Sequence, residues 1–436
     1  MILAISIILF FTATVFYIRI NGTDWISYYS FIYYFYIVFG IIGSYLIYFG
    51  YFDDSYFISP ISDKLDVKQL GLISINFGLF GIFFGAFIVA ILAGRNKYKR
   101  YLDRSIIVNI EKEKINVFLF SILFIFSVSY YIYSTYPSPM IMAFQGYSPT
   151  DVALRRIEVT KDYQGIGVFS TIAIILSYVF PYYLFVRALI EKNVRSKALF
   201  GITLLISVFV LVLDGQKATI IFMLLGFIYI YKLCGHTIRF VGVVVLSAVI
   251  VIVLIFLYVV VMGSEFDDQL ASLVLERIFG AQAVSAFLVF DFYSPSNFIF
   301  FDSMHGALFK LLTSHQLSRS SEVLMESYYP GLREIGGWNV NGIFVHEAYS
   351  NFGWLGILFG SVYVGIGNGL LHNFFLSLKK TPLNISFFTY FAISFVSILT
   401  SFNDQLINTR SILVFLVFIV FVFFGKITSK LRYAVS

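Results

Sequence analysis

The chain has 436 residues, of which 59% are hydrophobic and only 12% are charged. Soluble domains carry about 25% charged residues and disordered chains are poor in hydrophobic residues, so the composition excludes both classes. The single cysteine, Cys234, excludes a disulfide framework and a cysteine-based metal site. The remaining class is an all-α polytopic membrane protein, which we expect to form one integral membrane domain over residues 1–436.

Membrane spans are predicted wherever about 20 consecutive residues are mostly apolar. Eleven stretches qualify or nearly qualify, at about 2–20, 28–52, 71–94, 115–134, 168–190, 198–213, 218–233, 241–262, 354–376, 385–401 and 410–426. The first lacks a basic flank and a cleavage site, so it is expected to be a retained span. Only the segment Asp214 to Lys217 separates the sixth stretch from the seventh. We interpret these two as helices joined by a tight turn, and one long broken helix is the alternative.

The distribution of basic residues predicts the orientation of the chain. With the N-terminus outside and the C-terminus inside, nineteen of the 30 Lys and Arg residues fall in inner segments, together with five of the 24 acids. Basic residues favour the cytoplasmic side. The long loops are therefore expected to lie on the outer side of the membrane.

Two outer loops are long, at about 135–167 and about 263–353. The second begins with an amphipathic stretch, Phe266 to Phe290, which we expect to pack on the membrane or dip into it. This loop is the only segment large enough for a small subdomain outside the membrane. The inner loops are short and no GxxxxGK[ST] motif occurs, which argues against ATP-driven work.

Several cations on the outer side are candidates for binding an anionic substrate. An arginine near hydrocarbon is costly, and its guanidinium group matches phosphate oxygens bidentately. These features favour a basic cavity that holds a phosphate- or diphosphate-linked lipid. Contacts with lipid headgroups or with outer acids are the alternative. The candidates are Arg156, Lys217, Arg277, Arg319, Arg333 and Arg410.

The stretch from Gly331 to Gly356 is glycine-rich and carries His346 and Glu347 just before a span. A helix that starts near Val345 would place His346, Tyr349 and Gly353 on one face. His346 is a candidate proton acceptor or phosphate partner, and a local hydrogen bond at a helix start is the alternative.

Aromatic residues near this stretch are candidates for stacking on sugars, although they could equally be interfacial anchors. They are Trp338 and Tyr349, with Tyr328 and Tyr329 beside them. His305 and His315 do not have ligand-like spacing, so we expect neither a metal site nor a cofactor.

These features together resemble the O-antigen polymerases, also called oligosaccharide repeat-unit polymerases or Wzy-type proteins, which are similar to the O-antigen ligases. The resemblance rests on many spans, two long outer loops with arginines, and the element from His346 to Gly356. Arg156 and Gly167 fit the spacing of an arginine element in the first loop. The second loop departs from this arginine-to-glycine spacing. Gly331 follows Arg319 by one residue more than the pattern has, and Gly342 follows Arg333 by two residues fewer.

The resemblance implies a GT-C-like fold and a metal-independent glycosyltransferase that joins undecaprenyl-diphosphate-linked oligosaccharides at the periplasmic face of the bacterial inner membrane. In that mechanism the cations hold the diphosphate, and His346 or Glu347 acts on the acceptor. The implied partners are this lipid-linked oligosaccharide, membrane lipids and an optional chain-length regulator, with no nucleic acid. The alternatives are an O-antigen ligase and a lipid-linked oligosaccharide flippase or other transporter. The chain has no internal repeat and few acids within its spans, both of which argue against a transporter.

Overall fold

The computed structural model describes residues 1–22, 24–94, 97–160, 163, 165–216, 218–238, 274–303, 319–335, 337, 339–340, 342–394 and 409–433. Every regular element within these residues is helical. Seven of the described helices are long and apolar enough to cross a membrane, and three shorter apolar helices accompany them. The chain is therefore a polytopic helical membrane protein, as its composition predicts.

Helices occupy the predicted spans wherever the structure describes them. The stretch 241–262 lies outside the described residues, and the stretch 385–401 is described as α-helix only to Ile393. The sixth and seventh spans are α10 (Val194–Val212) and α11 (Ala218–Leu233), with Gly215 at φ 72° between them. The prediction of two helices joined by a tight turn is confirmed, and Thr219 Oγ1 closes that turn by donating to the Leu211 carbonyl at 2.9 Å.

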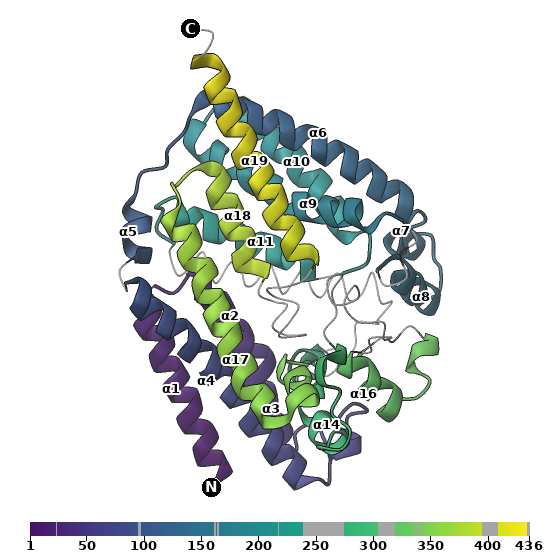
Figure 1. Cartoon of the computed structure of the whole chain (residues 1–436). Helices are drawn as coiled ribbons and strands as arrows, with labels where there is room; N and C mark the ends of the chain where they lie inside the picture. The colour runs from purple at the N-terminus through teal and green to yellow at the C-terminus, as the bar shows by residue number, and fades with distance from the viewer. Residues whose placement is uncertain are drawn as a thin grey trace. The chain divides into compact units, whose positions relative to one another are not determined.

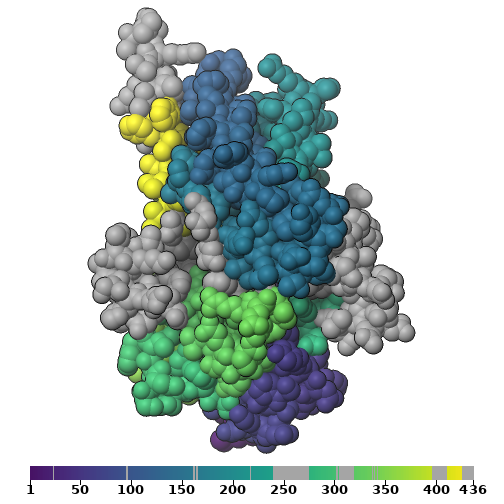
Figure 2. Space-filling view, turned by 90° about the vertical axis from the view of Figure 1, so that its right-hand side faces the viewer, coloured from purple at the N-terminus to yellow at the C-terminus, as the bar shows by residue number. Residues whose placement is uncertain are grey.

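The chain forms two compact units. The first unit contains residues 1–98, 265–377 and 394–409, and the second contains residues 99–264, 378–393 and 410–436. Within the first unit, the green surface of its later residues adjoins the purple surface of its N-terminal residues in Figure 2. Residues 265–353 of the second long loop fall within this first unit.

The first unit is built around α4 (Leu65–Ala93), which packs against α1 (Ile2–Asn21) and α17 (Val345–Ser377) (Figure 1). Its other α-helices are α2 (Tyr28–Tyr36), α3 (Gly43–Tyr48), α14 (Ser285–Phe292) and α16 (Ser320–Tyr328). Short π and 3-10 turns complete it: η1 (Ile37–Ile42), η2 (Ser59–Ile61), η3 (Glu276–Gly280), η4 (Phe300–Ser303) and η5 (Leu332–Ile335). Helix α5 (Lys97–Asp103) crosses the boundary between the units.

Glycines allow α4 and α17 to approach each other closely. A Cβ atom on Gly365 would lie 2.1 Å from the carbonyl oxygen of Ile82, and one on Gly85 would lie 2.5 Å from that of Val362. Small residues let membrane helices pack with their backbones in near contact. This contact fixes the part of α17 that follows His346.

Gly365→Ala should destabilise the protein, because its methyl group would collide with the backbone of α4. We expect a loss of about 1–3 kcal/mol in the free energy of unfolding, measured by thermal or denaturant unfolding in detergent. Gly201→Ala is the matched control, since nothing lies within 4 Å of a Cβ there. The control should stabilise α10 by up to about 1 kcal/mol, because alanine favours helix over glycine. Equal stability of the two variants would contradict this packing.

The segment from Glu276 to Phe292 consists of η3, a turn and then α14, whose residues 285–289 are all buried. One expectation for the second long loop is wrong where the structure describes it. Helix α17 begins at Val345 as predicted, but it breaks at Phe352 (φ −140°) and Gly353 (φ 59°). Gly353 therefore does not share a helical face with His346 and Tyr349. A Cβ there would lie 2.9 Å from the ring of Phe298, so long-range packing accompanies the break.

The second unit is arranged around α9 (Gly167–Glu191), which contacts α6 (Ile110–Thr135), α10, α11 and α18 (Pro382–Ile393) (Figure 1). Two short helices lie between α6 and α9, namely α7 (Pro139–Phe144) and α8 (Pro149–Thr160), and α19 (Thr409–Tyr433) ends the described chain.

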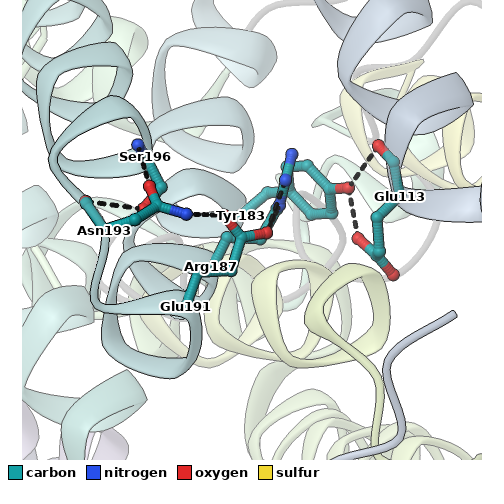
Figure 3. Close-up of polar contacts among 6 residues, drawn as sticks. All are labelled: Glu113, Tyr183, Arg187, Glu191, Asn193 and Ser196. Carbon is teal, nitrogen blue, oxygen red and sulfur yellow. Dashed lines mark hydrogen bonds and ion pairs between the residues drawn. The ribbon is translucent and has the colours of Figure 1, made fainter. Parts of the chain in front are cut away.

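A polar network ties α6, α9 and α10 together at one end of the second unit (Figure 3). The hydroxyl of Tyr183 donates to the side chain of Glu113, and Arg187 Nε donates to Glu191 at 2.8 Å. Asn193 caps α10 by accepting from the Ser196 N–H at 2.7 Å. These contacts join the first turn of α6 to α9, and the end of α9 to the start of α10.

Candidate functional site

The opposite end of the second unit brings together segments that are far apart in the sequence. The turn after α10 lies against α7, since the Met140 N–H donates to the Leu213 carbonyl at 3.3 Å. Arg156 on α8 approaches the same turn, where a Cβ on Gly215 would lie 4.0 Å from its Cδ. Arg410, at the start of α19, donates from Nε to Tyr390 Oη on α18 at 2.9 Å. Two of the predicted anion-binding cations therefore lie at the same end of this unit.

Asp214 is the buried acid of this end, with 6% of its surface exposed. Its carboxylate accepts the Gln216 N–H at 3.0 Å. Burial raises the pKa of Asp214 from an ordinary 3.8 to about 6, and the Gln216 hydrogen bond and the charges of Arg156 and Arg410 act in the opposite direction. One buried carboxylate thus interacts electrostatically with both arginines.

Both arginines retain unused hydrogen-bonding capacity. Arg156 and Arg410 are exposed, and within the described part of the chain neither is ion-paired with a carboxylate. Arg155, beside Arg156, has instead a structural role, because it donates to the Pro137 carbonyl at 2.9 Å and pairs with Glu158. A guanidinium group has five N–H donors, so this end can accept an anion with several oxygens.

The raised pKa of Asp214 should make the stability of the protein depend on pH. The folded state favours the neutral carboxyl group, so its contribution is full below about pH 4 and is lost as the pH rises through about 6. Asp214→Asn keeps the acceptor oxygen without the charge. We expect it to raise the free energy of unfolding by up to roughly 3 kcal/mol at pH 8 and by about half as much at pH 5. Unfolding curves of the variant and the native protein at both pH values would check this, and an equal effect at the two pH values would contradict it.

The first unit contains a second polar cluster, around His346. The residue is 2% exposed, and its Nδ1 lies 2.8 Å from Oγ of Ser320, which is 1% exposed. Gly342 lies close to both the His346 ring and Ser285. A Cβ atom at this position would lie 3.2 Å from His346 Cδ2 and only 1.5 Å from Ser285 Oγ. Ser285 is fully buried, and its hydroxyl has no hydrogen-bond partner among the described residues. An imidazole and an unsatisfied hydroxyl therefore adjoin the same glycine.

Glu347 points into a different part of this interior. Its Oε1 accepts from Ser303 Oγ at 3.2 Å, and Ser303 Oγ in turn accepts from Asn351 Nδ2 at 2.6 Å. Glu347 is 4% exposed. The contacts of the two neighbours differ, so His346 rather than Glu347 belongs to the cluster at Gly342.

The remaining predicted site residues are exposed or half-buried at other places, or lie outside the described residues. Arg277 is exposed in η3, Arg319 is the half-buried residue that precedes α16, and Arg333 forms an exposed ion pair with Glu326 at 2.5 Å. Tyr349 is half-buried among aromatic rings, 4.3 Å from the centroid of Phe290. Lys217 and Trp338 lie outside the described residues.

The predicted set is divided between the two units. Arg156 and Arg410 belong to the second unit, whereas His346, Glu347 and Arg277 belong to the first. The described residues contain no group of three or more His, Cys, Asp or Glu side chains that could hold a metal ion.

Sequence reasoning missed the residues that surround these predicted groups. The sequence places Asp214 in the tight turn, but the residue predicted to bind an anion there is Lys217. Tyr390, Ser320 and Ser285 carried no local signal, because each acquires its position only by contact with a distant segment.

No protein-family model, no curated protein and no solved structure matches this chain.

Proposed function

We propose that this protein is a membrane-embedded glycosyltransferase that joins polyprenyl-diphosphate-linked oligosaccharide repeat units into a surface polysaccharide. The observation that carries the proposal is the pair of exposed arginines, Arg156 and Arg410, beside the buried Asp214. The polytopic helical architecture supports it, since a polyprenyl substrate resides in the membrane. The resemblance of the element from His346 to Gly356 to that of the oligosaccharide repeat-unit polymerases supports it independently.

The chemistry requires charge neutralisation and a proton acceptor. The hydroxyl oxygen of the acceptor forms a bond to the anomeric carbon of the donor, and the bond from that carbon to the diphosphate breaks. The diphosphate leaves with the bonding electron pair, and the arginines stabilise its charge. The resemblance implies His346 as the general base that takes the acceptor proton. None of these steps calls for a metal, so activity should survive EDTA.

The direct test uses the purified protein in lipid nanodiscs with an undecaprenyl-diphosphate-linked oligosaccharide prepared from the same cells. The proposal predicts covalent dimers and longer oligomers of the repeat by mass spectrometry, with release of undecaprenyl diphosphate. Translocation of the lipid without chain growth would instead identify a flippase. Transfer only to a lipid A core would identify a ligase, and either result would overturn the proposal.

The proposed topology can be tested separately by cysteine labelling. Ser327 on α16 and Ser105 after α5 are both exposed, so a cysteine at either position should be reactive when its side of the membrane is accessible. In a Cys234→Ser background, Ser327→Cys should react with an impermeant maleimide in intact spheroplasts, and Ser105→Cys only after permeabilisation. The reverse pattern would overturn the orientation.

A further inference from the structure

We propose that the segment between α5 and α6, residues 104–110, binds the headgroup layer of a membrane that contains anionic phospholipid. This segment belongs to the second unit, together with residues 378–393. It leads into the first turn of α6, which holds Glu113 of the polar network, so it lies at the end of the unit opposite to the candidate site. Binding of lipid there is therefore independent of the proposed function.

Hydrogen bonds to the residues that precede α18 hold the segment in place. The Ile107 N–H donates to the Lys380 carbonyl at 2.8 Å, and Arg104 Nη1 donates to the Leu378 carbonyl at 3.3 Å. Lys380 is 2% exposed, and its ammonium group donates to the Leu102 and Arg104 carbonyls at 2.8 and 2.9 Å. Because these bonds fix the backbone, the fold itself determines which side chains of the segment are exposed.

Three apolar side chains of this fixed segment are exposed. The exposed fractions of Ile107, Val108 and Ile110 are 50%, 36% and 69%. The predicted span of α6 begins at about residue 115, so Ile110 lies about 7–8 Å beyond the apolar layer at 1.5 Å per residue. The headgroup region on each side of a bilayer is about 5–8 Å thick. The three side chains are therefore at the depth of the headgroups, where lipid can cover them.

The charges around these side chains complement anionic headgroups. Residues 99–114 and 378–380 contain seven cations and only three acids. Glu111 is half-buried and pairs with Lys114 at 3.2 Å, and Asp103 is the one exposed acid of these two described segments. The exposed cations are Lys99, Arg100, Arg104, Lys114 and Lys379. Apolar side chains flanked by cations bind membranes both by burying apolar area and by attracting anionic lipids.

Removal of two charges tests the electrostatic part of the proposal. Lys99 and Lys379 are exposed, and neither forms an ion pair among the described residues, so their replacement should not disturb the fold. The full-length protein in dodecyl maltoside is titrated with dioctanoyl phosphatidylglycerol, and with dioctanoyl phosphatidylcholine as the neutral lipid. Each cation near an anionic surface contributes about fivefold in affinity. Lys99→Gln combined with Lys379→Gln should therefore weaken phosphatidylglycerol binding by about twentyfold to thirtyfold.

Two comparisons control this titration. Lys99→Arg combined with Lys379→Arg keeps both charges, so it should bind phosphatidylglycerol like the native protein. Binding of phosphatidylcholine should be equal in all three proteins, because its headgroup has no net charge. Native affinity for phosphatidylglycerol in the Gln pair would overturn the proposal, and so would an equal loss in the Arg pair or a parallel loss of phosphatidylcholine binding.

The depth of the segment is measured separately with a nitroxide spin label. In the Cys234→Ser background, Ile107→Cys is labelled in nanodiscs of mixed phosphatidylglycerol and phosphatidylcholine. Ile122→Cys is the matched control, since Ile122 is 49% exposed within the predicted span of α6. Power saturation in the presence of oxygen and of a water-soluble nickel chelate reports the depth of each label. Access of the chelate to the Ile107 label should lie between that of the Ile122 label and that of a free label in water.

Two results at Ile107 would overturn the proposal. One is access of the chelate equal to that of the free label, which would place the segment in water, or equal to that of the Ile122 label, which would place it among the acyl chains. The other is spectral broadening that disappears when labelled protein is mixed with unlabelled protein, because a second copy of the chain would then cover the segment. Neither the titration nor the depth measurement involves turnover, so both outcomes are separate from that of the polymerisation assay.

Discussion

Arg156→Ala should reduce polymerisation about tenfold to a hundredfold or more, the largest effect expected in the second unit. Each hydrogen bond to a charged group contributes about 1.5–3 kcal/mol, and about 1.4 kcal/mol corresponds to a factor of ten. Arg156 is exposed and forms no ion pair within 4 Å among the described residues, although its charge acts on Asp214, so its removal should cost little stability. The measurement is kcat/KM for oligomer formation, together with the affinity for undecaprenyl diphosphate.

Companion variants separate charge from geometry at this site. Arg156→Lys keeps the charge but loses the bidentate N–H donors of the guanidinium group. It should therefore be more active than Arg156→Ala but less active than the native protein. Arg195→Ala is the matched control, an exposed arginine at the start of α10, whereas Asp214 follows the end of that helix. Native activity in Arg156→Ala, or an equal loss in Arg195→Ala, would remove Arg156 from the diphosphate site. Arg410→Lys tests the second arginine in the same way. This variant lacks the Nε–H that donates to Tyr390 Oη.

His346→Asn should abolish the polymer ladder, with a loss of about 10²–10⁴-fold in kcat, because a general base contributes that much. Asparagine is the informative replacement, since its amide can still reach Ser320 Oγ but cannot take up a proton at neutral pH. The protein should therefore fold and bind lipid normally. In the native protein the rate should fall on acidification, because a protonated imidazole cannot accept the acceptor proton.

A histidine outside this cluster provides the control. His236 is exposed and its ring stacks on Tyr231 at 4.3 Å, so His236→Asn should leave the rate unchanged. Long polymer at the native rate in His346→Asn would show that the histidine has a structural role only. Loss of the His346→Asn protein from the membrane fraction would also indicate a structural role.

Local patterns were sufficient to predict most helices. A run of apolar residues must bury its backbone polar groups in lipid, and a helix satisfies them within its own segment, so the spans follow from composition. The Asp214–Gly215 turn and the helix start at Val345 were predictable for the same reason, because their signals lie within a few residues. The break at Phe352 and Gly353 was not, since the ring of Phe298 that packs against Gly353 comes from another part of the chain.

The sequence by itself determined that this is an all-α polytopic membrane protein and singled out Arg156, Arg410 and His346. Only the tertiary structure decided their surroundings: the buried Asp214 near the two arginines, Tyr390 beside Arg410, and Ser320 beside His346. It also decided that residues 285–289 of α14 are buried. The physical reason is the same in each case. Hydropathy acts along the chain within one helix, whereas burial, charge pairing and hydrogen bonding depend on residues that folding brings from distant segments.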